Sequence, residues 1–299
     1  MLSQIRGSIF LLFLIANTTM WCCTIYLLFG VKLLSPSRAV RNSLERTMES
    51  CAENWIATNN FFLNTFYSIK WNFKGLESLR RDRSYLVSSN HQSWTDIVIL
   101  QRAFNRRIPF LRFFIKQELT YVPLLGWAWH ALNFPRMKRY SKEFLERHPE
   151  KRGEDLATTR KMCELLRGKP MSILNFLEGT RYTEAKHARQ QSPYKRLLRP
   201  KTGGLAFVIE CMGDQFHSLL DVTIFYPQGK VGIWELLCGK LSEVLLEVRE
   251  LPLPQFAAGG SYLEDEAHRS RMQSWVQELW ERKDQRLGEL SLGPSGPAL

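Results

Sequence analysis

The stretch SSNHQSWTDIVIL, residues 88–100, places His91 five residues before Asp96, where a β-like run gives way to a helical pattern. On one continuous helix this spacing separates two side chains by about 140°. At a strand-to-helix turn, however, they can meet. An aspartate that accepts a hydrogen bond from one imidazole nitrogen leaves the other nitrogen free to take a proton. The stretch therefore predicts a catalytic base, His91, oriented by Asp96.

A structural alternative explains the same residues. Ser93 followed three residues later by Asp96 is typical of a helix N-terminus, where such side chains satisfy the first free backbone N–H groups. In this interpretation His91 is an ordinary loop residue. The sequence contains no G-x-S-x-G motif and no P-loop. A catalytic His91 would therefore activate a hydroxyl of the substrate itself.

A second stretch, NFLEGTRYT at residues 175–183, ends another apolar run with chemically useful side chains. Gly179 lets the backbone approach a ligand closely, and the planar guanidinium of Arg181 suits phosphate oxygens. Ligands bind at the carboxyl ends of strands in open α/β sheets, where this pattern places Glu178 and Thr180 as well. An ordinary surface turn with a salt bridge is the alternative.

Short β-like runs alternate with helical patterns through the rest of the chain. Strands are expected within residues 84–89, 108–116, 170–180 and 218–226, and helices over about 94–104, 154–167, 202–212 and 262–286. Strands that alternate with helices indicate an α/β fold. We therefore expect residues 71–299 to form one domain, a layered mixed sheet flanked by helices.

The N-terminal run GSIFLLFLIANTTMWCCTIYLLFGV, residues 7–31, carries no charge. At about 1.5 Å per residue it can cross a hydrocarbon core about 30 Å thick, and it is too long for a cleaved signal peptide. A kinked or re-entrant helix and a buried soluble helix are the alternatives. Basic residues are more frequent after the run than before it, which predicts that the rest of the chain is cytoplasmic.

A second helix is expected over residues 37–70, where apolar residues recur at three- or four-residue steps. Such a helix can lie on a membrane surface, pack on the first helix or face a core. We expect residues 1–70 to form a helical membrane-anchoring segment that precedes the α/β domain.

The formal net charge of +12 favours an anionic partner, such as lipid, a phosphorylated substrate, an acidic protein or nucleic acid. The uncharged N-terminal run argues against a nucleic-acid-binding protein. The six cysteines form no C-x-x-C pair and no zinc-ligand spacing with histidine. We therefore expect reduced packing cysteines, no metal site and no cofactor.

Together the two motifs resemble those of the glycerolipid acyltransferase family, whose members acylate lysophosphatidic acid. The H-x-x-x-x-D motif of that family is matched by His91 and Asp96, and its F-x-E-G-T-R motif by residues 176–181. The combination is far more specific than either motif alone, and the resemblance spans roughly residues 70–245.

Two further blocks are similar to those of the family. Residues 116–139 contain a fitting Lys116, and the basic residue expected later in this block can be Arg136, Lys138 or Arg139. The apolar strand that ends in proline resembles DVTIFYP, which ends at Pro227.

The resemblance implies transfer of a fatty acyl group from acyl-CoA or acyl carrier protein to the free hydroxyl of a lysophospholipid, most simply lysophosphatidic acid. His91 would deprotonate that hydroxyl and Asp96 would orient His91. Lys116 and Arg181 would hold the phosphate. The implied substrate-binding residues are Glu178, Gly179, Thr180, Arg181, Lys116, Arg136 and Pro227. The membrane is an implied partner, whereas nucleic acid and cofactors are not.

A non-catalytic, membrane-tethered lipid-binding protein is the alternative function. The intact residues of both motifs argue against it. Eukaryotic relatives often carry extra C-terminal membrane spans, and no second long apolar segment follows residue 70 here. This difference predicts a bacterial inner-membrane enzyme with its catalytic domain on the cytoplasmic side.

Overall fold

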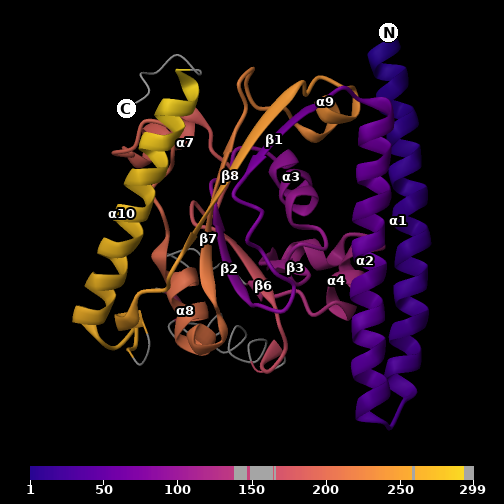
Figure 1. Cartoon of the computed structure of the whole chain (residues 1–299), viewed down its shortest axis with the longest axis horizontal. Coiled ribbons are helices and arrows are strands. Elements are labelled where there is room, and N and C mark those ends of the chain that lie inside the picture. Colours follow the sequence, from indigo (N-terminus) through magenta and orange to yellow (C-terminus); the bar gives the residue numbers. More distant parts are fainter. Residues whose placement is uncertain (138–146, 149–163, 165, 258–259, 293–299) are drawn as a thin grey trace.

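A six-stranded mixed sheet forms the centre of the molecule in the computed structural model, with helices on both of its faces (Figure 1). The structure describes residues 1–137, 147–148, 164, 166–257 and 260–292. The helix expected over 154–167 therefore lies almost wholly outside the described residues. The expected layered α/β architecture with an apolar N-terminal helix is confirmed.

The strands of the sheet follow the order β1-β8-β7-β2-β6-β3. Neighbouring strands are parallel except for β7 and β8, which are antiparallel. The strands are β1 (Lys70–Lys74), β2 (Tyr85–Ser89), β3 (Leu111–Phe113), β6 (Ser172–Phe176), β7 (Ser218–Phe225) and β8 (Glu243–Leu251). Because β2, β6 and β7 are mutually parallel, their carboxyl ends meet at one edge, where both sequence motifs lie.

Strand β2 is buried on both faces, as a central strand should be. Tyr85 and Val87 pack into the apolar core beneath α3, whereas Leu86 packs into the core beneath α8 and α10. This alternation follows from the two-residue period of a strand, and it explains why SYLVSS reads as a continuous run rather than a half-polar strand.

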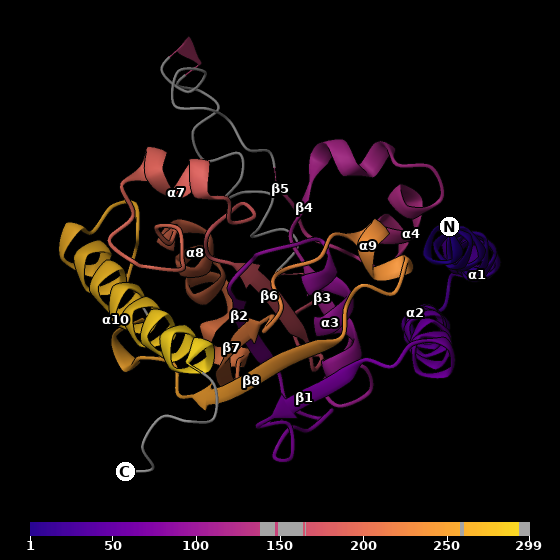
Figure 2. The same ribbon diagram turned by 90° about the horizontal axis from the view of Figure 1, so that it is seen from above.

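Helices α8 and α10 cover one face of the sheet, and α3 separates the other face from a hairpin of α1 and α2 (Figure 2). The helices are α1 (Leu2–Leu34), α2 (Arg38–Phe66), α3 (Thr95–Phe104), α4 (Leu125–Ala131), α7 (Glu184–Gln190), α8 (Thr202–Met212), α9 (Ile233–Leu237) and α10 (Glu266–Ser291). Short 3-10 turns are η1 (Gln117–Tyr121), η3 (Gly213–Gln215) and η4 (Gln255–Ala257).

Polar contacts cross the apolar interface between α1 and α2. The Asn17 amide donates to Asn59 Oδ1 at 2.9 Å, and the Trp55 indole N–H donates to Thr18 Oγ1 at 3.0 Å. Buried polar groups need their partners, so a shifted register would leave these groups unpaired. The contacts therefore specify how the two helices align.

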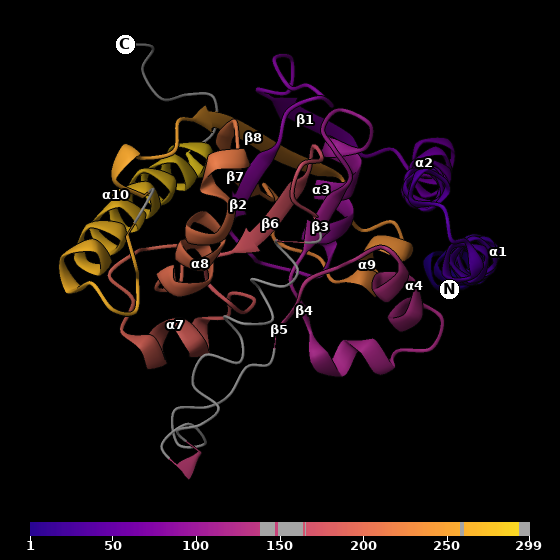
Figure 3. The same cartoon turned by 90° about the horizontal axis from the view of Figure 1, so that it is seen from below.

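The hairpin packs on the domain through α4 and α9, which lie between α1 and the sheet (Figure 3). Most of the apolar surface of α1 is nevertheless exposed: in its most apolar window 22% of residues are buried. Among the described residues, α1 is the one helix long and apolar enough to cross a membrane by length and composition.

Three elements differ from the sequence expectations. Residues 108–116 form two short strands, because β4 (Ile115–Lys116) leaves the main sheet to pair with β5 (Arg136–Met137). Helix α2 ends at Phe66, and β1 follows it. Strand β1 lies at one edge of the sheet and pairs with β8, the next strand inward. Neither strand was expected from the sequence, because each mixes polar and apolar residues.

A buried ion pair connects helix α10 to the sheet. Lys283 Nζ lies 2.6 Å from Asp221 Oδ1 in β7, and Arg249 of β8 contacts the other oxygen of that carboxylate at 2.5 Å. Burial lowers the pKa of Lys283, whereas the nearby Asp221 carboxylate opposes that shift. Removing one partner of such a pair leaves an uncompensated buried charge, so the contact makes the position of α10 specific.

Candidate active site

The turn after β2 is held in place by Asn90. Its amide donates to Ile224 O, and its Oδ1 accepts from Ile224 N–H, both at 2.9 Å. This pair of bonds continues the pairing of β2 with β7 for one residue beyond the strand. The next residue, His91, therefore begins the turn from a defined position at the carboxyl edge of the sheet.

His91 and Asp96 are in direct contact. Their Nδ1 and Oδ2 atoms are 2.8 Å apart, as the strand-to-helix turn predicted. The imidazole also stacks on Phe176, with ring centroids 3.9 Å apart and planes 16° from parallel. Nε2 has no hydrogen-bond partner among the described residues. With the proton on Nδ1, Nε2 is a free acceptor on a side chain that is 12% exposed.

The buried Asp96 carboxylate accepts more than one hydrogen bond. Oδ2 also accepts from the backbone N–H groups of Gln92 and Ser93 at 2.6 and 2.8 Å. The Ser93 hydroxyl in turn accepts from Thr95 N–H at 3.2 Å. Asp96 Oδ2 therefore holds both the backbone of the turn before α3 and the His91 imidazole. The contacts expected from both interpretations are present, and the catalytic role of His91 stays a prediction.

Tyr226, at the end of β7, donates its hydroxyl to Asp96 Oδ1 at 2.5 Å. Burial and the adjacent carboxylate raise the pKa of this phenol well above its usual value, so it stays a donor. Tyr226 lies outside the motifs from which the site was predicted. Its signal was an aromatic residue directly before Pro227, where the β7 strand was expected to end.

Glu178 is placed beside His91 by the sheet register. Ser89 of β2 pairs with Phe176 of β6, so the residues two positions further along each parallel strand lie side by side. The buried carboxylate accepts from His91 N–H at 2.7 Å and from Leu198 N–H at 3.0 Å. Burial raises its pKa to about 8. Oε1 thus holds the backbone of His91, and Oε2 holds the backbone of Leu198.

The remaining residues of the second motif shape the turn beside this carboxylate. Gly179 has a φ of +66°, and a Cβ there would lie 3.1 Å from the Lys201 side chain, so glycine is the residue that fits. Thr180 Oγ1 accepts from Lys186 Nζ at 2.8 Å. The Arg181 guanidinium is exposed and lies 4.9 Å from the centre of the Trp94 ring.

Positive charge accumulates around this turn. Partial burial lowers the pKa of Lys186, and four further cations add to the shift: Arg181, Arg189, Lys116 and Lys230. The Lys230 ammonium donates to Tyr182 O at 2.8 Å, next to the backbone of His91. The site is therefore suited to an anionic substrate.

The other expected substrate-binding residues lie at the edges of this region. Lys116 is exposed at the end of β4. Arg136 lies in β5, where its backbone pairs with Ile115 of β4. Pro227 is exposed and directly follows Tyr226. The alternative basic residues, Lys138 and Arg139, lie outside the described residues.

An apolar cavity of about 280 Å³ opens beside Trp94, at the start of α3. It lies between the α1–α2 hairpin, α3 and α4. A second apolar cavity of about 230 Å³ follows the same interface toward α9, and the two share Ile56, Val98 and Ile233 among their lining residues. The apolar space therefore extends along α3 from the region of His91.

Within the described ranges, no group of three or more His, Cys, Asp or Glu side chains is placed to hold a metal ion.

The family model described as Acyltransferase matches residues 70–226, which is more than half of the chain and includes both motifs. The chain therefore belongs to the acyltransferase family. The boundary of the match coincides with the start of β1.

Named relatives agree with this family. The chain is 27% identical to lysocardiolipin acyltransferase 1 of Danio rerio, over 94% of this chain and 70% of that protein. It is 30% identical to 1-acyl-sn-glycerol-3-phosphate acyltransferase gamma of Mus musculus, over 56% of this chain and 43% of that protein. The chain thus spans less than half the length of the mouse relative.

The fold is also similar to a solved structure. The crystal structure of the 1-acyl-sn-glycerophosphate acyltransferase PlsC from Thermotoga maritima superposes with a TM-score of 0.57 at 18% identity, covering 96% of this chain and 98% of that one. At this identity the likeness shows the fold alone.

Proposed function

We propose that this protein is an O-acyltransferase that moves a fatty acyl group from acyl-CoA or acyl carrier protein to the free hydroxyl of a lysophospholipid, most simply lysophosphatidic acid. The observation that carries the proposal is the imidazole of His91, which is oriented at Nδ1 and unpartnered among the described residues at Nε2, beside a cluster of cations. Membership of the acyltransferase family and the names of the relatives support the same reaction.

In this reaction His91 Nε2 takes the proton of the acceptor hydroxyl while the hydroxyl oxygen attacks the thioester carbonyl. A C–O bond forms, the C–S bond breaks, and the imidazolium returns its proton to the departing thiolate. Asp96 stabilises the imidazolium because its Oδ2 faces Nδ1. Base catalysis of this kind contributes about 10²- to 10⁴-fold, and alignment of the two substrates contributes much of the rest.

His91→Ala is expected to abolish acyl transfer and to leave the protein folded, because the imidazole is a partly exposed turn side chain. Asp96→Asn should be nearly as damaging, since an amide stabilises the imidazolium less and favours the wrong tautomer. It should also lower stability by about 1 kcal/mol, because its nitrogen cannot accept from N–H groups at the start of α3. Turnover and thermal melting of both variants provide the measurement.

The matched control for this experiment is His217→Ala, which removes an exposed histidine outside the site. It should keep full activity. Folded and active His91→Ala protein would exclude the catalytic role of His91. Absence of acyl transfer by the folded wild-type protein would instead favour the alternative function, a membrane-tethered lipid-binding protein.

Arg181→Ala is expected to weaken the acceptor phosphate contact. Loss of a charge-assisted hydrogen bond costs roughly 1.5–3 kcal/mol, or about 10- to 150-fold in the specificity constant for lysophosphatidic acid. Arg181→Lys should recover only part of the loss, because an ammonium cannot make the two-point contact. Steady-state kinetics with lysophosphatidic acid test this, with the α10 surface variant Arg282→Ala as the control. Wild-type values for both Arg181 variants would remove Arg181 from the site.

The two adjacent apolar cavities along α3 are proposed to receive a fatty acyl chain. They share lining residues, one of them is lined by Trp94 near His91, and their lining is mainly apolar. Val98 borders both cavities. Val98→Phe should block the passage between them and shift the preferred acyl donor toward shorter chains. Competition between donors of different length measures the shift, and an unchanged preference would place the acyl chain elsewhere.

The α1–α2 hairpin, residues 1–70, is proposed to hold the α/β domain, residues 71–299, at a membrane, in the expected case on the cytoplasmic side of a bacterial inner membrane. Leu12 and Ile15 are 67% and 52% exposed on α1, and apolar surface of this kind is stable in lipid. The double variant Leu12→Glu and Ile15→Glu should lose membrane attachment during cell fractionation. The α10 control Gln285→Glu should keep its membrane attachment. If the double variant also stays attached, the proposal is contradicted.

A further inference from the structure

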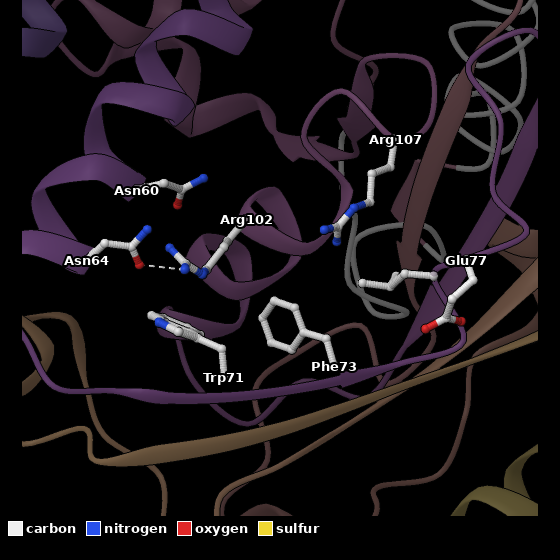
Figure 4. Close-up of a pocket in the computed structure, with 8 residues that line it drawn as sticks. Asn60, Asn64, Trp71, Phe73, Glu77, Arg102 and Arg107 are labelled. Atoms are coloured by element: carbon white, nitrogen blue, oxygen red, sulfur yellow. Dashed lines mark hydrogen bonds between the residues drawn. The ribbon is translucent and has the colours of Figure 1, made fainter.

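A polar cavity of about 540 Å³ opens at the far end of α3 from His91 (Figure 4). It lies between α2, β1 and the turn after α3. Because α3 has ten residues, its two ends are about 15 Å apart. None of the lining residues belongs to the site described above. The cavity is therefore a separate feature of the fold.

Arg102 is held rigidly at one side of this cavity. Its guanidinium lies 4.0 Å from the centre of the Trp71 ring, and its Nη2 donates to Asn64 Oδ1 at 2.6 Å. Its Nη1 is buried and has no hydrogen-bond partner among the described residues. Stacking on an aromatic ring orients a guanidinium, so the side chain has a fixed position and an unused donor.

Arg107 approaches from the opposite side, and both guanidinium groups flank the space above Phe73 (Figure 4). Arg107 donates to the backbone oxygen of Ala103 at 3.1 Å. Within the part of the chain that the structure describes, neither arginine forms an ion pair with a carboxylate. Burial and the charge of Arg107 lower the pKa of Arg102. An anion between the two groups would relieve this repulsion.

The other walls indicate what kind of anion fits. Phe73 and Trp71 provide an aromatic floor, and the cavity is large for a bare inorganic anion. Glu77 lines the far end and is exposed, where its carboxylate would face an amine or hydroxyl group. The fork of an arginine matches the oxygens of a phosphate. The lining therefore suits a phosphate that carries an organic group.

We propose that this cavity binds a phosphate ester, with the phosphate between Arg102 and Arg107 and its organic group on the aromatic floor. Two sources share this chemistry. One is the headgroup of an anionic phospholipid, since α2 exposes Phe61 and Phe66 beside the cavity-lining Asn60 and Asn64. The other is the phosphorylated nucleotide end of acyl-CoA. Binding here does not depend on catalysis by His91.

The test compares binding of two probes to the full-length protein in detergent or on vesicles. Calorimetry measures the affinity for 3′-phosphoadenosine 5′-diphosphate. Vesicle flotation measures how much phosphatidylglycerol increases binding to phosphatidylcholine vesicles. Arg107→Gln and Arg102→Gln should each weaken either the affinity for the nucleotide or the phosphatidylglycerol-dependent vesicle binding. The expected loss is about 10-fold, the effect of losing a charge-assisted contact. The probe affected identifies the source, a nucleotide phosphate or a lipid headgroup.

Lys74→Gln is the matched control, because it removes a 72% exposed charge from β1 outside the cavity lining. It should leave both measurements unchanged. Because Arg107 is exposed, Arg107→Gln should retain the fold. It therefore still tests the proposal if Arg102→Gln, which removes the stacked side chain, impairs folding. Wild-type affinity of Arg107→Gln for both probes would overturn the proposal, as would failure of the wild-type protein to bind either probe. The same measurements on His91→Ala should match wild type, which separates this site from acyl transfer.

Discussion

The position of the His91 imidazole depends on the hydrogen bonds of the Asp96 carboxylate. This carboxylate is fully buried and accepts from the imidazole of His91, from two backbone N–H groups in the turn before α3 and from the hydroxyl of Tyr226. Such a carboxylate can be buried only because its donors are preorganised around it. The carboxylate thereby links the turn after β2, the first turn of α3 and the end of β7, which together define the position of one imidazole.

A second buried carboxylate, Glu178, completes this arrangement from the neighbouring strand. Its contact with the backbone of His91 follows from the parallel pairing of β2 with β6. The two motifs are far apart in sequence but equivalent in position, since each follows its strand by the same offset. The F-x-E-G-T-R motif consequently has two parts with different tasks: a buried glutamate that supports the base and an exposed arginine that faces solvent beside other cations.

Helix α3 organises the space around this centre. Asp96 in its first turn contacts His91, and the apolar cavities follow the side of α3 that faces the hairpin. The two arginines of the polar cavity lie at and just beyond its last turn. The α1–α2 hairpin closes the apolar cavities and leaves much of α1 exposed. Apolar space and cationic, polar space therefore lie at different parts of one interface along α3.

Three features could be predicted from the sequence: the alternation of strands and helices, the apolar N-terminal helix and the contact of His91 with Asp96. These are local features, set by the periods of helix and strand and by a turn of six residues. Tertiary structure alone decided the partnership of Tyr226 with Asp96, the backbone role of Glu178 and the two kinds of cavity beside α3. Strand order and register bring those residues together. Strands β1 and β8 could not be predicted, because each mixes polar and apolar residues. Pairing between distant strands depends on residues far apart in the sequence, and periodicity within a single segment does not predict it.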